Sequence, residues 1–232
     1  MKCLVFVVAA LIGIGCTAAV QAPSVSSYRP RVPQKPRLRV VSELGQIDEK
    51  ATDALFRRLE GDIVACHRTG LRDVESLSGD VRVFVRIGRT GKARYSYVEQ
   101  STLGDRKTEK CIVGLMMAAD WPTPEDGEVE LRKSFSVDAP SDAATPQIWG
   151  DERLAAVTRQ LGEASKCKRG EAAQYGVTAY IVPHGDTGRA KTVGVAAPDS
   201  AADAKADCIA EAIKKITWPS PGGGIAKISF PL

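Results

Sequence analysis

The chain contains an internal repeat, which limits its fold more than any other feature of the sequence. Cys111 and Cys208 are each followed ten residues later by a Trp-Pro-x-Pro sequence, at residues 121–124 and 218–221. Each of these cysteines is also preceded, twenty residues earlier, by a glycine within a turn-forming segment. The two turn segments are 88–93 and 185–190. This agreement in order and spacing indicates a duplication, so both copies should adopt the same local structure.

Two further landmarks occur in the same order in both copies. A cysteine lies upstream of each turn and a phenylalanine lies in each last apolar segment: Cys66 and Phe135 in the first copy, Cys167 and Phe230 in the second. We therefore predict a first module at 46–138, a linker at 139–149 and a second module at 150–232.

Apolar residues at intervals of three and four predict an amphipathic helix at the start of each copy. The apolar face of this helix ends at a cysteine and consists of Phe56, Leu59, Ile63 and Cys66, then of Leu154, Val157, Leu161, Ala164 and Cys167. A second helix is expected over 105–119, with an inward face formed by Cys111, Leu115 and either Val113 or Met117. Trp-Pro ends this helix, because proline disfavours helical backbone in the residue before it.

Residues 81–87 alternate between small apolar side chains and arginine or phenylalanine, which predicts a half-buried strand. The glycine turn then reverses the chain into 92–99, so the two segments form a hairpin. A last strand is expected at 129–137. The order helix, hairpin, helix, strand favours a three-stranded antiparallel sheet with both helices on one face. We therefore predict an α+β fold of two tandem small modules.

The N-terminus has the features of an export signal. Lys2 supplies a positive charge, and residues 4–14 form an apolar core that is too short to span a bilayer. A small residue precedes Cys16, as in the bacterial lipobox, after which the cysteine is lipidated. Ordinary cleavage after Ala19 or Ala22 is the alternative.

On the lipidation hypothesis, residues 1–15 are the signal peptide and residues 16–45 combine a lipid anchor with a tether. Thr17 is not acidic, which in lipoproteins of this kind favours the outer membrane. We therefore expect a periplasmic outer-membrane lipoprotein of a Gram-negative bacterium. Proline-rich residues 23–41 should remain extended and solvated. The cations of this tail are Arg29, Arg31, Lys35, Arg37 and Arg39.

The basic charge of the sequence belongs to this tail and the leader. Subtracting these five cations and Lys2 from 32 basic residues leaves 26, against 28 acidic residues in the whole chain. The remaining sequence is therefore not basic, and we predict no nucleic-acid binding. The tail is interpreted as a spacer, with contact between its cations and lipid phosphates or the cell wall as the alternative.

Four of the six cysteines belong to the two copies, because Cys3 lies in the leader and Cys16 at the lipidation point. Four cysteines in an oxidising compartment allow three pairings. The repeat selects one bridge per copy, Cys66 with Cys111 and Cys167 with Cys208. Closing loops of this length contributes roughly 4 kcal/mol on the chain-entropy model. Metal binding is the alternative, although the cysteines lack closely spaced pairs.

A helix with cysteine, a hairpin with a Gly-Lys-Ala-type turn, a second helix with cysteine, Trp-Pro-x-Pro and a final strand together resemble the TonB/TolA-type C-terminal domain. The set is most similar to the cysteine-containing variety at the ends of myxobacterial gliding-motility proteins. The resemblance covers 48–138 and, less fully, 150–232. It implies a periplasmic protein-interaction module whose sheet edge receives a peptide strand. Energy transducers of this type carry an inner-membrane helix; no such segment is recognised here, which favours a passive adaptor.

We predict no enzymatic activity, no cofactor and no metal site. His67 stands beside a disulfide cysteine and His184 beside a turn, and both are expected to be exposed polar residues rather than catalytic bases. Glycines 222–224 precede a strand, so they do not form a phosphate loop. Trp121 and Trp218 are expected to fill the cores, with a polyproline-type ligand as the alternative.

The second copy is predicted to carry the partner-binding surface. Its hairpin strand has Ala179, Ile181 and Pro183 where the first copy has a charged face, and apolar sheet faces commonly form interfaces. Its last strand is expected to receive a peptide strand from another envelope protein along an edge formed by Ile225, Ala226, Lys227, Ile228, Ser229 and Phe230. The alternatives are that this face packs against the first module or under Ile148 or Trp149, and that the protein is a structural lipoprotein contacting cell wall or lipid through its tail.

Overall fold

The computed structural model describes residues 44–170 and 172–232. The predicted signal peptide, the predicted lipid attachment at Cys16 and the cations of the tail lie outside the described residues. The fold is α+β, with two separate sheets. We call residues 44–138 the first half and residues 139–232 the second half.

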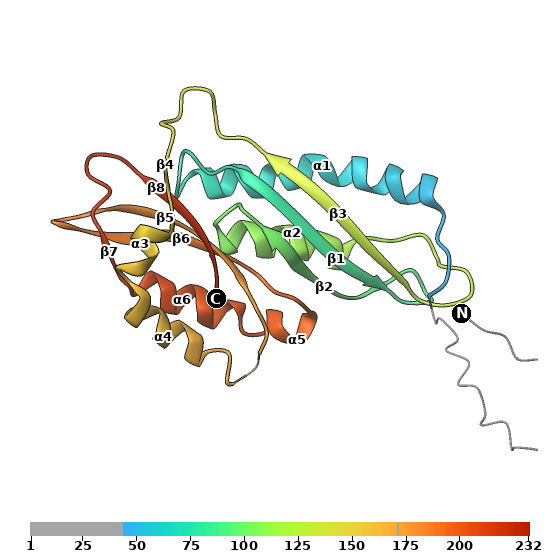
Figure 1. Cartoon of the computed structure of the whole chain (residues 1–232). Helices are drawn as coiled ribbons and strands as arrows, with labels where there is room; N and C mark the ends of the chain where they lie inside the picture. The colour runs from blue at the N-terminus through green and yellow to red at the C-terminus, as the bar shows by residue number, and fades with distance from the viewer. Residues whose placement is uncertain (1–43, 171) are drawn as a thin grey trace, which may run out of the picture. The chain divides into compact units, whose positions relative to one another are not determined.

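The first half has the predicted order of helix, hairpin, helix and strand. Its elements are α1 (Glu49–Leu71), β1 (Gly79–Ile87), β2 (Ala93–Ser101), α2 (Arg106–Ala118) and β3 (Val129–Val137). The three strands form an antiparallel sheet in the order β2-β1-β3. Both helices lie on one face of this sheet (Figure 1).

Each helix of the first half begins at an aspartate that caps its first turn. The Asp48 carboxylate accepts a hydrogen bond from the backbone N–H of Ala51 at 2.9 Å, and Asp105 accepts one from the N–H of Thr108 at 3.0 Å. Such caps satisfy backbone donors that have no partner within the helix. After α2, the Trp121 side chain enters the core, where it is 5% exposed.

The second half repeats this order, but both of its helices are broken. Its elements are β4 (Gln147–Trp149), α3 (Asp151–Ala155), α4 (Thr158–Lys166), β5 (Gly176–His184), β6 (Thr187–Ala196), α5 (Ser200–Asp203), α6 (Ala206–Lys214), β7 (Thr217–Pro219) and β8 (Ala226–Pro231). The sheet order is β4-β8-β5-β6-β7. The short edge strands β4 and β7 were not predicted from the sequence.

Each half has its own apolar core between sheet and helices. Trp218 is 1% exposed in the second core and Trp121 is 5% exposed in the first, so the prediction that both tryptophans fill cores is confirmed. The prediction for His67 is wrong. Its ring is buried against the chain between α1 and β1, and Nε2 lies 2.7 Å from the carbonyl oxygen of Leu77.

The predicted inward face of α2 is displaced by one position. Ile112 and Met116 are the fully buried apolar residues, whereas Cys111 and Met117 are exposed. The reason is that α2 packs against two partners. The disulfide directs Cys111 toward α1, and Ile112, about 100° further around the helix, faces the sheet.

Candidate functional site

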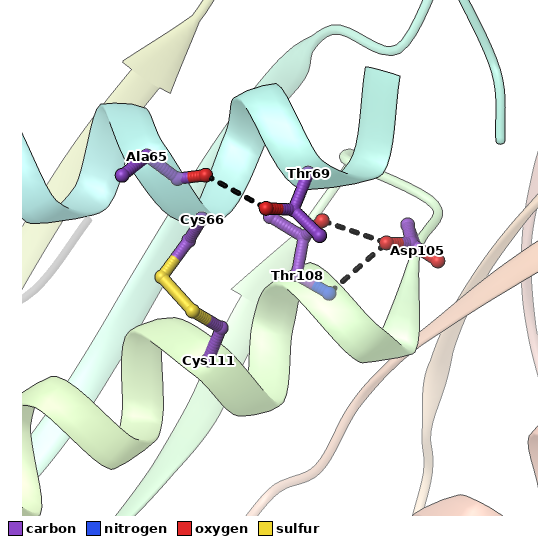
Figure 2. The surroundings of a disulfide bond; sticks show 6 residues. All are labelled: Ala65, Cys66, Thr69, Asp105, Thr108 and Cys111. Carbon is purple, nitrogen blue, oxygen red and sulfur yellow. Dashed lines mark hydrogen bonds between the residues drawn. A yellow bond between two sulfur atoms is a disulfide. The ribbon is translucent and has the colours of Figure 1, made fainter. Parts of the chain in front are cut away.

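The two disulfides connect the cysteines that the repeat pairs. Cys66 of α1 is bonded to Cys111 of α2, and Cys167 at the end of α4 is bonded to Cys208 of α6. Figure 2 shows the first bond bridging two adjacent helices, beside the Asp105 cap. Each disulfide therefore joins the two helices that cover the sheet of its half.

The apolar face predicted on β5 is not a surface. Ala179 and Ile181 are fully buried in the second core, and only Pro183, near the end of the strand, is exposed. The error comes from turn length: two residues separate the paired His184 and Thr187, whereas five, 88–92, separate the paired strands of the first hairpin. The turns differ by three residues, an odd number, so aligning the two copies on their turn glycines assigns the residues of β5 to the wrong face.

The opposite face of β5 packs against the first half. Tyr180 is fully buried and belongs to the first core. Its hydroxyl donates toward the carbonyl oxygens of Ser76 and Ser78 at 3.2 Å and accepts the N–H of Ser78 at 3.1 Å. Lys227 of β8 donates to the same Ser78 carbonyl at 2.7 Å. The face of β5 that meets the first half is therefore the one opposite to the predicted face of Ala179 and Ile181.

A buried carboxylate completes this contact between the halves. Glu109 of α2 accepts the backbone N–H of Val195 at 2.9 Å and the hydroxyl of Ser101 at 2.6 Å. Burial raises the pKa of the Glu109 carboxyl, although these hydrogen bonds and the charge of Arg106 oppose that effect. Arg106 donates to Asp203 and Asp207 of the second half, both at 2.9 Å.

Two glycines allow the backbones of the halves to touch at this point. A Cβ atom on Gly194 would lie 2.4 Å from Oε1 of Glu109 and 2.9 Å from the Cα atom of Gly104. Gly104 itself has a φ of +82°, which side chains rarely adopt. Backbone approach this close joins the halves through a tightly packed interface.

We predict that Glu109→Gln makes stability less dependent on pH. Because the folded-state pKa of Glu109 lies above its ordinary value of 4.5, the folded protein keeps this proton where the unfolded chain has lost it. The free energy of unfolding of the wild type therefore falls as pH rises through that interval. Glutamine keeps an acceptor for the N–H of Val195 and does not titrate. The free energy of unfolding of Glu109→Gln, relative to that of the wild type, should therefore increase from pH 4 to pH 7. Parallel urea-unfolding profiles over pH for the two proteins would contradict this.

The edge predicted on the last strand is partly covered by the chain itself. β4 pairs with β8 in parallel, with Gln147 opposite Ala226 and Trp149 opposite Ile228. Trp149 is 6% exposed and belongs to the second core. Residues 226–228 are therefore not free to receive another strand. This corrects the prediction for this part of the edge, and the cause is a linker strand that the sequence did not reveal.

The other predicted edge residues have different surroundings. Ile225 packs against the first core. Ser229 and Phe230 line a hollow of about 590 Å³ where the second sheet meets the end of β2. The Ser229 hydroxyl lies 2.8 Å from that of Thr178. These residues belong to the junction of the two halves rather than to a continuous open edge.

The free edge lies on β3 of the first half. All nine residues of β3 pair with β1, and in the part of the chain that the structure describes no strand pairs with its other side. Its core-facing Leu131 and Phe135 are only half-buried. The matching residues of β8, Ala226 and Phe230, are 0% and 5% exposed. In the second half, β4 with Trp149 covers the edge of the last strand. In the first half, no described strand covers the corresponding edge of β3.

The outer face of the first sheet carries aromatic and charged side chains that pair with one another. The Phe84 ring stacks on Tyr97, with ring centres 5.0 Å apart, and the guanidinium of Arg132 lies 4.7 Å from the centre of the Phe84 ring. Arg82 and Arg132 both donate to Glu99, at 2.9 and 2.8 Å. The charges of this face are thus largely neutralised within the sheet.

The described residues contain no group of three or more His, Cys, Asp or Glu placed to hold a metal ion. No helix within 44–170 and 172–232 has the length and apolar character needed to cross a membrane. His184 is exposed on the second hairpin. Comparison of the chain with protein-family models, with curated proteins and with solved structures finds no match.

Proposed function

We propose that this protein is an adaptor of the bacterial cell envelope that binds a partner protein by strand addition. In this proposal the chain consists of two tandem copies of one TonB/TolA-like module. It is exported to the periplasm and held at the outer membrane by a lipid on Cys16. The receiving edge is β3 of the first copy, and the partner contributes an extended peptide segment.

The observation that carries the proposal is the difference between the last strands of the two copies. β8 has neighbours on both sides along 226–228, while β3 has only β1 among the described strands. An edge strand presents unpaired N–H and C=O groups that another strand can satisfy. The half-buried Leu131 and Phe135 add apolar surface that a bound strand would cover.

The second copy supports this function by holding the first copy rigid. Tyr180 and Glu109 join the sheet of one copy to the core and helix of the other. The other edge strand of the first sheet, β2, is contacted by the second half, because the Val98 carbonyl accepts the N–H of Ala197 at 2.8 Å. A partner strand is therefore directed to β3.

Site-specific cross-linking in cells tests this proposal. A photoreactive residue at Ser134 or Ser136, both exposed on β3, should form a defined cross-linked product with one envelope protein. The matched control is Asp186, which is exposed in the second hairpin turn away from any edge. Products that are absent from β3, or equally abundant from Asp186, would show the proposal to be wrong. Cross-linking is repeated in isolated envelopes at high salt, where an undiminished yield would separate strand addition from contact through the basic tail.

A further inference from the structure

The open edge carries a cation on its core-facing side. β3 pairs with β1 so that Lys133 lies opposite Val83, a fully buried core residue. Lys133 is half-buried, and its Nζ lies 5.0 Å from the centre of the Phe56 ring on α1. Among the residues that the structure describes, no carboxylate pairs with Lys133. The cation therefore lies at the open edge of the sheet, between β3 and α1.

The second half has an apolar residue at the same place. Ile228 lies opposite Ala179 of β5, as Lys133 lies opposite Val83 of β1. Trp149 of the linker strand pairs with Ile228, which is 2% exposed. In the second half, an apolar strand residue is thus covered by an apolar side chain. At Lys133 the same arrangement would bury an ammonium group without a counter-charge.

The outer face of the sheet does not offer a comparable charge preference. Arg132 on β3 is already paired with Glu99, and Arg86 on β1 is paired with Glu130 at 2.6 Å. A strand that binds beside β3 meets neutralised pairs on this face. On the core side it meets the one lysine of β3, whose ammonium has only an aromatic ring as neighbour among the described contacts.

We infer that the strand that binds β3 presents an aspartate or glutamate to Lys133, at the position that Trp149 takes opposite Ile228. This inference rests on the proposed function. An inward-pointing lysine opposes the addition of an apolar strand, because burying an unpaired charge is unfavourable. A carboxylate removes that penalty and forms a charge-assisted hydrogen bond. Lys133 thereby selects acidic segments and rejects apolar ones.

Three synthetic peptides test the charge preference on the full chain. They share the sequence of residues 144–151 and have tryptophan, glutamate or lysine at the position of Trp149. Dissociation constants are measured with labelled peptides, and binding is located by protection of the β3 amides from hydrogen exchange. The glutamate peptide should bind about tenfold more tightly than either other peptide, because lysine places a like charge beside Lys133 and tryptophan buries the Lys133 ammonium without a counter-charge. In Lys133→Glu the order of the lysine and glutamate peptides should reverse.

The outcomes separate this inference from the proposed function. Equal protection of β3 by all three peptides would leave strand addition intact and overturn the role of Lys133. Protection by none of them would also overturn the inference, while the cross-linking from Ser134 decides the proposed function independently. Binding only after deletion of residues 23–41 would make the tail the occupant of the β3 edge. Protection of the β3 amides in a dimer without peptide would make a second copy the occupant. Either result would overturn the inference about Lys133.

Discussion

Replacing Tyr180 by alanine should lower the free energy of unfolding by about 3–5 kcal/mol, the usual cost of truncating a buried aromatic side chain. Tyr180 is fully buried although its strand belongs to the second sheet, because its ring lies in the first core. Truncation leaves a cavity there and leaves the N–H of Ser78 without the hydroxyl that accepts it. Urea unfolding followed by circular dichroism measures the change.

Two variants separate the parts of this effect. Tyr180→Phe keeps the ring but removes a hydroxyl that bonds to Ser76 and Ser78, and should cost about 1–3 kcal/mol. Tyr95→Ala is the control on an exposed face, because Tyr95 is 37% exposed while still stacking on Phe84. If Tyr180→Ala were no more destabilising than Tyr95→Ala, the packing of the second sheet against the first core would not contribute to stability.

Local features of the fold could be predicted from the sequence. The 3.6-residue apolar spacing located α1, and the alternation from Val81 to Ile87 located β1. The phase of the repeat identified both disulfide pairs, because it aligned Cys111 with Cys208. Each of these inferences depends on residues that are close in sequence or aligned by the sequence repeat.

The contacts between the halves could not be predicted in this way. Glu109 follows the cap of α2 and resembles an ordinary surface charge, yet the second half packs over it and buries it fully, and there it accepts the backbone N–H of Val195. The faces of β5 depended on a turn only a few residues shorter than its counterpart. Trp149 offered one signal, a lone large aromatic residue in a polar linker, but its pairing with Ile228 spans most of the second half.

The predicted and the observed free edges differ for the same reason, because the contact that covers β8 is between residues far apart in the sequence. The sequence pattern places the candidate edge on the last strand of the second half, at residues 225–230. The strand that covers β8 comes from the start of the second half, because β4 precedes α3. In the first half, the residues before α1 follow another path: Leu44 bridges to Glu128 and Gln46 to Glu125, ahead of β3. A difference in the route of two short segments therefore decides which edge is open.

Removing either disulfide should lower the free energy of unfolding by about 4 kcal/mol on the chain-entropy model. The sequence separations are 45 for Cys66–Cys111 and 41 for Cys167–Cys208, so the two losses should be nearly equal. The double variants Cys66→Ala/Cys111→Ala and Cys167→Ala/Cys208→Ala serve as controls for each other. Both are compared with the wild type in urea without reductant.

The shape of the transitions carries the second part of this prediction. Because Tyr180 completes the first core and Glu109 accepts from the second sheet, loss of one half removes buried contacts from the other. Each double variant should therefore unfold in one transition, detected at the same urea concentration by tryptophan fluorescence and by circular dichroism. Two separated transitions would mean that each half is stable without the other. The contact through Gly104 and Gly194 would then set the position of the first half without adding to its stability. In that case, loss of the Cys167–Cys208 bond would leave peptide binding at β3 unchanged.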